Sequence, residues 1–377
     1  MGNILFDYVV IGGGIFGSYA AKILGTNNTV ALIEKESALL QRASKNNQTR
    51  VHTGAHYLRA PRTAMSAQSN LSRFLIDHNY AISKTSQHFY AIAREGSLTD
   101  SDGFERFCGW LGVKATKSEE CDLFDPSRIS NTYQIDEHSF DPVLLARQYL
   151  IELLEKNVSL YFDSHILSIE KLNEKWIIKV RLREEIVIIE AANIVNATYS
   201  NLNAISKLSG IPMSRIKHEY SELLLVFVPK LRDKAITVMD GPFFSITPYG
   251  ATGLHVLSSV IYTHHASVMN SEFELSCQLM NTTCRVDTFN LCQTCDTKPK
   301  SLSKFMLNQL RTYVPDIGTI FVHGKIETIK STWGSNDYRD ERNTSIKKIT
   351  SNPGFYNVLS GKVSSIYELE VVLNENG

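Results

Sequence analysis

The sequence lacks a net charge, and it lacks any long apolar run. Lys plus Arg and Asp plus Glu both number 39 among 377 residues. This balance gives no electrostatic case for nucleic acid or for an anionic membrane surface as partner. The longest apolar run, Leu223 to Val228, is far shorter than the roughly 20 apolar residues of a membrane-spanning helix. We therefore expect neither a nucleic-acid partner nor an integral membrane segment.

We also expect no export signal, and the sequence shows no clear metal motif. The first expected strand begins at about Phe6, which leaves no room for the charged and apolar parts of a signal peptide. We expect a cytoplasmic protein, whose six cysteines stay reduced. Four of them, Cys277, Cys284, Cys292 and Cys295, fall within 19 residues, but their spacing matches no common zinc pattern. Free thiols are the expectation, and a metal or iron–sulfur site there stays open.

What the sequence does contain is a glycine-rich turn between a strand and a helix. Phe6 to Ile11 is an apolar, β-branched run typical of a buried parallel strand. Gly12, Gly14 and Gly17 follow in the spacing G-x-G-x-x-G, and Ser18 to Leu24 has helical spacing. Such glycines allow a tight turn, close approach of the backbone to a pyrophosphate, and close packing of helix on strand. The helix N-terminus offers N–H groups and a partial positive charge to the phosphates.

A second strand gives this turn the context of a dinucleotide site. Thr29 to Ile33 is a further apolar run, and it ends on Glu34. A carboxylate at this distance accepts hydrogen bonds from the ribose hydroxyls of the adenosine and repels a 2′-phosphate, which disfavours NADP. A glycine turn without any ligand is the alternative, but the strand, helix, second strand and acid that the motif requires are all present.

A long polar segment, Gln41 to Arg62, follows the second strand, and we call it the polar loop. It is dense in hydrogen-bonding side chains and poor in periodicity, and a loop this long inside an α/β unit is usually functional. It leaves the carboxyl end of the sheet, where ligands bind in such folds. A solvated connection is the alternative interpretation.

The middle of the chain predicts one long helix and a small meander. Asp141 followed by Pro142 is a strong helix start, and the pattern continues to about Lys156. Between Ile166 and Ala191, three runs alternate as in an antiparallel meander. Asn193 to Ala197 then predicts a buried strand.

The second half of the chain predicts another sheet and a final strand–turn–helix unit. Arg215 to Val228 has the pattern of one long strand, and two shorter strands follow. Ser301 to Tyr313 predicts an amphipathic helix. Near the end, Phe355 to Leu359 predicts a strand, with a glycine turn at Gly361 and a helix from Val363 onward.

Four of these segments, in this order along the chain, resemble the D-amino-acid oxidase, glycerol-3-phosphate dehydrogenase and 2-hydroxyglutarate oxidase superfamily of FAD-dependent oxidoreductases. The glycine turn with Glu34 is the first. Ser44 to Leu58 is similar to the family's H-x-G-x-x-Y loop beside the flavin ring. Val195 to Thr198 is similar to its V-N-A-A/T-G strand end, with Tyr199 in place of the usual glycine. Gly354 to Ser365 is similar to its C-terminal segment at the flavin pyrimidine.

This resemblance implies FAD as cofactor and an α/β fold. We expect a Rossmann-like FAD-binding domain, with a parallel sheet and an antiparallel meander, and an α+β substrate domain with a mostly antiparallel sheet. The FAD-binding domain would be discontinuous, from residues 1–80, 132–205 and 320–377. Residues 81–131 and 206–319 would form the substrate domain. The residues expected to contact FAD are Gly12, Gly14, Ile15, Phe16, Gly17, Glu34, Lys35, Asn47, Gln48, Arg50, Val51, His52, Thr53, Gly54, Ala197, Thr198, Gly361, Lys362, Val363 and Ser364.

Three residues are the catalytic candidates: His52, Lys362 and Arg342. Lys362, together with the helix expected after it, suits the stabilisation of negative charge near flavin N1 and O2. His52 could hydrogen-bond the ring, act as a base or be purely structural. Arg342 and Arg50 could clamp a carboxylate or phosphate, because a guanidinium fork matches planar anions.

Three more residues are substrate candidates in addition to these arginines: His56, Tyr57 and Tyr249. The expected function is oxidation of a small amine or hydroxy compound, expected to be anionic, by hydride transfer to flavin N5. Oxygen, or a quinone or other carrier, would then take the electrons. A 2-hydroxy-acid or polyol-phosphate dehydrogenase with a non-oxygen acceptor, and a non-catalytic flavin-binding scaffold, are the alternatives. The substrate, the base and the oligomeric state stay open.

Overall fold

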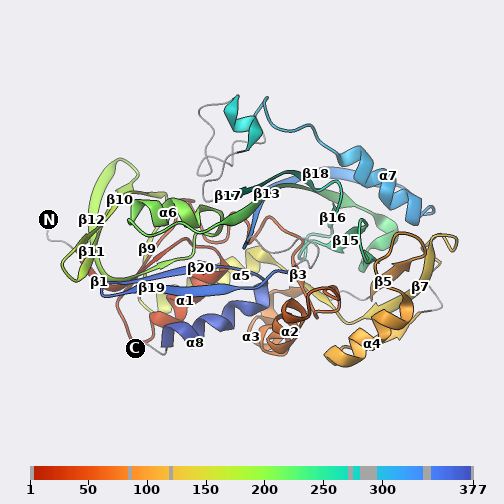
Figure 1. The fold of residues 1–377 in the computed structure, drawn as a ribbon, viewed down its shortest axis with the longest axis horizontal. Coiled ribbons are helices and arrows are strands. Elements are labelled where there is room, and N and C mark those ends of the chain that lie inside the picture. Colours follow the sequence, from red (N-terminus) through yellow and green to blue (C-terminus); the bar gives the residue numbers. More distant parts are fainter. Residues whose placement is uncertain are drawn as a thin grey trace.

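The computed structural model of the protein describes residues 4–83, 87–118, 122–270, 275–280, 295–333 and 341–374. The strands of these residues form two large sheets and a small one, with helices packed against them (Figure 1). One large sheet has a parallel centre and the other is mostly antiparallel. This arrangement confirms the expected α/β fold class.

The first sheet carries the glycine-rich turn at the carboxyl end of its central strand. Its parallel strands lie in the order β9-β2-β1-β12-β20. Strands β11 and β10 extend it from β12 as an antiparallel meander, and β19 pairs with β20. The bounds are β1 (Ile4–Ile11), β2 (Val30–Ile33), β9 (Ser159–Tyr161), β10 (Ser164–Leu172), β11 (Lys175–Leu182), β12 (Glu185–Asn196), β19 (Ser345–Ser351) and β20 (Gly354–Leu359).

Three helices pack together on one face of this sheet. They are α1 (Ile15–Leu24), α5 (Pro142–Glu155) and α8 (Glu368–Asn374), and Figure 1 shows α1 and α8 side by side. Tyr19 and Tyr149 are buried between them and the sheet. The predicted cap of α5 is confirmed, because the Asp141 carboxylate accepts from the amide of Val143 at 2.8 Å. On the other face, α6 (Leu202–Leu208) packs near the meander.

The second sheet forms the opposite wall of the molecule. Its strands lie in the order β17-β13-β16-β15-β14-β5-β7-β6, and β18 pairs with β13. Helix α7 (Ser303–Tyr313) covers β15 and β16 (Figure 1), and α4 (Ser101–Leu111) packs through Phe104 against β5 and β7. The bounds are β5 (Gln87–Ala93), β6 (Ala115–Lys117), β7 (Ile129–Ile135), β13 (Ile216–Phe227), β14 (Lys234–Met239), β15 (Phe244–Pro248), β16 (His255–Ser259), β17 (His264–Asn270) and β18 (Phe321–Trp333).

A small sheet fixes the polar loop between the two large ones. Its order is β3-β8-β4, so the middle of the polar loop is paired instead of free in solvent. Two short helices follow the loop. The bounds are β3 (Arg50–Val51), β4 (Ile82–Ser83), β8 (His138–Phe140), α2 (Pro61–Ser69) and α3 (Leu71–Asp77).

The strand pairing moves two of the expected domain boundaries. Strand β18 pairs with β13 along its whole length, so residues 321–333 lie in the second sheet and not in an FAD-binding segment beginning at 320. Strand β7 crosses the expected boundary at 131/132 and also lies in the second sheet. A strand pattern in the sequence does not reveal the partner of the strand, which explains both shifts. The division into two domains stays a prediction.

The last unit of the chain begins differently from the expectation. A single helix from Val363 was wrong, because residues Val363–Tyr367 form a 3₁₀ helix and α8 begins only at Glu368. A short 3₁₀ turn has poorer hydrogen-bond geometry than an α-helix, so its dipole at Lys362 is weaker than that of a full helix. Among the residues that the structure describes, no helix is long and apolar enough to cross a bilayer.

Candidate active site

One large cavity of about 1840 Å³ is lined by residues of both large sheets. The turn between β1 and α1, the polar loop and the carboxyl ends of β12 and β20 line it from the first sheet. Strands β13 and β18 line it from the second. Ligand cavities commonly measure about 300–1,000 Å³, so this one has room for a large cofactor and a second molecule.

The glycine turn at one end of the cavity has the geometry of a dinucleotide cradle. Gly12 has φ +101, and a Cβ there would lie 2.8 Å from the carbonyl oxygen of Ala197. A Cβ on Gly17 would lie 1.8 Å from the carbonyl oxygen of Gly12, so only glycine lets α1 approach β1 this closely. Gly14 faces the cavity, where its backbone is accessible, and the Ser44 hydroxyl accepts from the next amide, that of Ile15, at 3.0 Å.

Glu34 lies at the end of β2, beside this turn. Its carboxylate accepts hydrogen bonds from the amides of Gly13 at 2.5 Å and of Glu36 at 2.9 Å. Burial raises its pKa, and the two amide donors oppose that rise. Glu34 lines the cavity, and a carboxylate has further acceptor sites that could bind the hydroxyls of an adenosine ribose.

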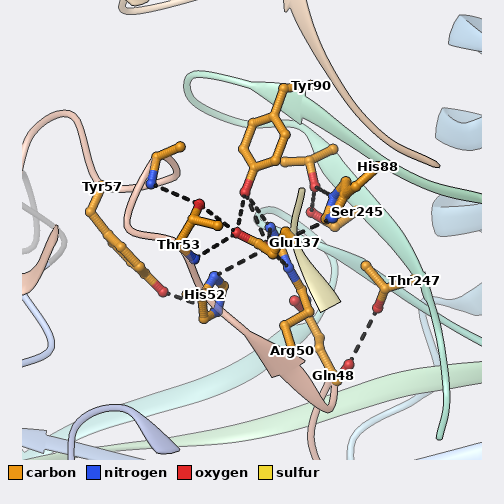
Figure 2. A network of polar contacts seen from close by, with 12 residues as sticks. Gln48, Arg50, His52, Thr53, Tyr57, His88, Tyr90, Glu137, Ser245 and Thr247 are labelled. Atoms are coloured by element: carbon orange, nitrogen blue, oxygen red, sulfur yellow. Dashed lines mark hydrogen bonds and ion pairs between the residues drawn. The ribbon is translucent and has the colours of Figure 1, made fainter. Parts of the chain in front are cut away.

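A buried carboxylate, that of Glu137, organises the middle of the polar loop (Figure 2). Arg50 donates to it through Nε at 2.8 Å and through Nη2 at 2.5 Å. The amide and hydroxyl of Thr53 each donate at 3.0 Å, and the Tyr90 hydroxyl lies at 3.1 Å. Burial alone would raise the pKa of Glu137, but Arg50 and the other partners lower it to about 2. The pair is therefore ionised at neutral pH.

His52 projects from the same network toward the cavity. Its Nδ1 lies 3.7 Å from Glu137 Oε1, and its Nε2 lies 3.3 Å from the Tyr57 hydroxyl (Figure 2). Burial, followed by the charges of Lys362 and Arg50, lowers the pKa of His52 well below its ordinary value. The imidazole is therefore neutral at physiological pH, which suits a hydrogen-bonding role better than that of a strong base.

Lys362 and Arg342 reach the cavity from two chain segments in close contact. A Cβ on Gly361 would lie 2.1 Å from the carbonyl oxygen of Arg342, so this glycine allows the two segments to touch. Lys362 Nζ lies 4.2 Å from the centre of the Tyr57 ring. Burial and the charge of Arg50 lower the pKa of Lys362 to about 7.

The second sheet contributes a charged wall. Glu219 on β13 lies between Lys217, with Nζ 2.8 Å from its carboxylate, and Lys330 of β18, with Nζ 2.9 Å from it. Burial would raise the pKa of Glu219, but Lys330 and its other cationic neighbours hold it below its usual range. Beside this ion cluster, His264 Nδ1 lies 2.8 Å from the Ser221 hydroxyl, and burial lowers the pKa of His264 to about 4.

A comparison with known families agrees with this geometry. The family model described as FAD dependent oxidoreductase matches residues 7–362. The chain belongs to this family. The protein is thus an FAD-dependent oxidoreductase, which confirms the resemblance seen in the four sequence segments and the expected cofactor.

Single relatives are more distant. The oxidoreductase is 26% identical over 259 residues to the FAD-dependent monooxygenase FPY4 of Fusarium mangiferae, a match that covers 67% of this chain and 64% of the relative. Its fold is similar to glycine oxidase from Geobacillus kaustophilus, with a TM-score of 0.70 at 13% identity over 99% of this chain and 94% of that one. It is equally similar to L-alpha-glycerophosphate oxidase from Mycoplasma pneumoniae, with a TM-score of 0.70 at 14% identity over the same shares. At these identities the likeness shows the fold alone.

The residues of the oxidoreductase fit FAD at the glycine turn. Gly12 and Gly17 leave no room for a side chain, and Gly14 presents bare backbone to the cavity. Glu34 would hold the adenosine ribose, and the N-terminus of α1 would face the pyrophosphate. The polar loop and the turn at Gly361 line the same cavity, as the flavin end requires.

The cavity brings together most of the residues that the sequence indicated. They are Gly12, Gly14, Ile15, Phe16, Glu34, Lys35, Asn47, Gln48, Arg50, His52, His56, Tyr57, Ala197, Thr198, Arg342, Gly361, Lys362 and Val363. Their contacts with FAD or substrate stay predictions. For Arg50, the guanidinium pairs with Glu137, so the structure assigns its charge to the protein and not to a substrate anion.

Six candidates do not line the cavity: Gly17, Val51, Thr53, Gly54, Tyr249 and Ser364. Val51 is in the core, and Thr53 donates to Glu137. Ser364 is buried and donates to the carbonyl of Ala67, while the Tyr249 hydroxyl donates to that of Lys45. Gly17 and Gly54 pack against neighbouring backbone. These six residues therefore pack or hydrogen-bond within the protein and do not face the cavity.

Sequence reasoning missed Glu137 and the ion cluster of Lys217, Glu219 and Lys330. Glu137 lies in a short polar turn with no motif around it, so no local signal marks it. For β13 there was a signal: residues 217, 219, 221 and 223 alternate along the strand and line the cavity together. Among the described residues, no group of three or more His, Cys, Asp or Glu could hold a metal. Cys284 and Cys292 lie outside the described residues, so the question of metal at the four cysteines stays open.

Proposed function

We propose that this FAD-dependent oxidoreductase oxidises a small anionic amine or hydroxy compound. The observation that carries the proposal is a pair of cationic residues, Arg342 and Lys362, that line the cavity from two chain segments in contact. Two other cations of the cavity wall, Arg42 and Arg50, are already paired with Glu36 and Glu137.

Arg342 and Lys362 are the proposed anion-binding groups. Both residues line the cavity beside the contact between Gly361 and Arg342. The flavin is expected at Gly361 and the adenosine at Glu34, so both cations would lie at the flavin end. A guanidinium binds a carboxylate or phosphate through two parallel hydrogen bonds, and an ammonium adds a point charge. Arg50 is not included, because Glu137 neutralises it.

His52 and Lys362 are the proposed groups at the reaction centre. When bound, the flavin accepts a hydride at N5 from a C–H next to nitrogen or oxygen. The neutral imidazole of His52 is held through Nε2 by the Tyr57 hydroxyl and would hold a hydrogen bond at the ring. The Lys362 ammonium would stabilise negative charge at the pyrimidine end. Lys362 also has a pKa of about 7, so near neutral pH it can hold or release a proton.

The test is reduction of the bound flavin without oxygen. Purified protein with FAD is mixed anaerobically with a panel of amino acids, N-methylated amino acids, 2-hydroxy acids and polyol phosphates. The absorbance band of oxidised flavin, at about 450 nm, is then followed. The proposal expects at least one anionic member to bleach this band. If only neutral or cationic compounds bleach it, the anionic substrate is wrong, and if none does, a non-catalytic flavin protein is favoured.

Monooxygenation is a second candidate, favoured by the likeness to the monooxygenase FPY4. A monooxygenase needs an external reductant for its flavin when the substrate does not reduce it. Consumption of NADH or NADPH in air that depends on a panel compound would support it. Bleaching by the substrate alone supports the oxidase or dehydrogenase, and reoxidation by oxygen or by a quinone then separates these two.

A further inference from the structure

Tyr199 stands in the cavity wall in a backbone conformation that suits glycine. Tyr199 lies three residues after the last residue of β12, Asn196, and its φ is +56. The left-handed region is sterically costly for a residue with a large side chain, and such residues persist there when the surroundings hold them. The Tyr199 side chain is therefore held by contacts that outweigh the cost.

Those contacts join Tyr199 to the second sheet. Its hydroxyl accepts a hydrogen bond from the amide of Ser331 on β18 at 2.9 Å. Its ring packs on a small apolar cluster formed by Leu202, Ile216 and Leu359, where Trp333 also packs. The phenol thus bridges the end of β12 and the strand that carries Lys330.

The Tyr199 phenol also lies within electrostatic range of Arg342, one of the two proposed anion-binding groups. Tyr199, Lys330, Ser331, Trp333 and Arg342 all line the cavity. The positive charge of Arg342 and the negative charge of Glu219 both act on the Tyr199 phenol, and burial raises its pKa. A ligand anion held by Arg342 would therefore have the Tyr199 ring as a neighbour.

We propose that Tyr199 is a specificity-determining residue that limits the length of the apolar part of the substrate. The claim rests on the proposed function, because it assumes an anion held near Arg342. In this arrangement the ring occupies the space between the anion and the apolar cluster under it. Short-chain acids fit against the ring, whereas a longer chain collides with it. Removal of the ring joins that space to the cavity and exposes Ile216 and Leu359 to the ligand.

The experiment measures binding of two straight-chain acids, propanoate and hexanoate, to the protein with FAD. Binding is followed by the change that each acid causes in the flavin absorbance. The variants Y199G and Y199N remove the ring and suit a positive φ, since glycine and asparagine tolerate this region. The variant Y199F is the matched control, because it keeps the ring and loses only the hydroxyl. Flavin content and thermal melting are recorded for each protein.

We expect Y199G and Y199N to shift the ratio of the two dissociation constants by tenfold or more in favour of hexanoate. Each buried methylene contributes about fourfold in affinity, and hexanoate has three more than propanoate. Y199F should keep the ratio of the wild type. The proposal is overturned if both ring-deleted variants keep that ratio, or if Y199F shifts it as much as they do.

The same measurement distinguishes an error in the proposed function from an error in the role of Tyr199. If neither acid perturbs the flavin in the wild type or in any variant, the anionic substrate is overturned, and the length limit with it. If propanoate binds to the wild type and the ratio does not move in Y199G and Y199N, only the role of Tyr199 is overturned. One of the two ring-deleted variants with normal flavin content is enough for this decision.

Discussion

Arg50 and Glu137 form a buried ion pair although 87 positions separate them in the chain. The side chains expose 3% and 0% of their surface. Arg50 belongs to β3 in the polar loop, and Glu137 lies in the turn between β7 and β8. The same carboxylate also binds Thr53 and faces His52, so one ion pair fixes the part of the loop that lines the cavity (Figure 2).

Substitution of Glu137 by Gln should destabilise the protein by about 3–5 kcal/mol, because it leaves the Arg50 guanidinium buried without its counter-charge. Flavin content should fall with it, since the polar loop loses its anchor. The double variant R50M/E137L should recover much of the loss, because a buried ion pair replaced by apolar groups of similar size is often neutral. Urea unfolding of the wild type, R50M, E137L and R50M/E137L gives the coupling energy. The control E155Q, at the exposed end of α5, should change stability by less than about 0.5 kcal/mol.

Substitution of Gly14 by Ala should weaken FAD binding without preventing folding. A Cβ at Gly14 would meet only the Ser44 hydroxyl, at 3.2 Å, whereas one at Gly17 would lie 1.8 Å from a backbone oxygen. G14A should therefore fold with a melting temperature near that of the wild type and yet bind FAD roughly tenfold or more weakly, the equivalent of one lost hydrogen bond to a phosphate. G17A should lose both stability and FAD. The exposed helical G109A, with open space around it, should keep both. Titration of the flavin-free protein with FAD measures the difference, and equal affinity of G14A and wild type would contradict it.

The sequence predicted the parts of the site that depend on local geometry. The glycine spacing, Glu34 and the turn at Gly361 are short-range patterns, and Gly12, Gly14, Glu34 and Gly361 all line the cavity. The fold class was implied by the resemblance of four segments to the FAD-dependent family, and the motifs of that resemblance are short-range patterns as well.

The remaining parts depend on pairing between distant segments, which a single sequence does not show. Glu137 becomes important only because β8 pairs with β3 and brings it to Arg50. Lys330 reaches Glu219 only because β18 pairs with β13, and the expected boundary at 320 had placed these strands in different domains. The 3₁₀ start of the last helix was also missed, since its sequence carries an ordinary helical pattern.

Substitution of Arg342 by Gln should weaken binding of an anionic ligand by roughly 10- to 100-fold, the loss expected for a hydrogen bond to a charged group. Flavin content should stay normal, because Arg342 is proposed to hold the substrate and not FAD. Titration with a carboxylate, followed by the flavin absorbance, measures the change. The control R311Q replaces an exposed arginine of α7 and should have the affinity of the wild type. Equal affinity of R342Q and R311Q would remove Arg342 from the proposed site.

Lys362 should make anion binding depend on pH near neutrality. Its pKa is lowered to about 7 by burial and by Arg50, so the side chain is an ammonium below that pH and an amine above it. Carboxylate affinity should therefore be full below pH 7 and fall as the pH rises through about 7. In K362M the affinity should be low throughout and flat across this window, whereas K304M, on the exposed face of α7, should follow the wild type. Dissociation constants of the carboxylate, measured over about three pH units from pH 6 to 9, check this dependence. A wild-type curve that stays level to pH 9 would show that Lys362 keeps its proton or does not contact the anion, and a fall that persists in K362M would assign the titration to another group.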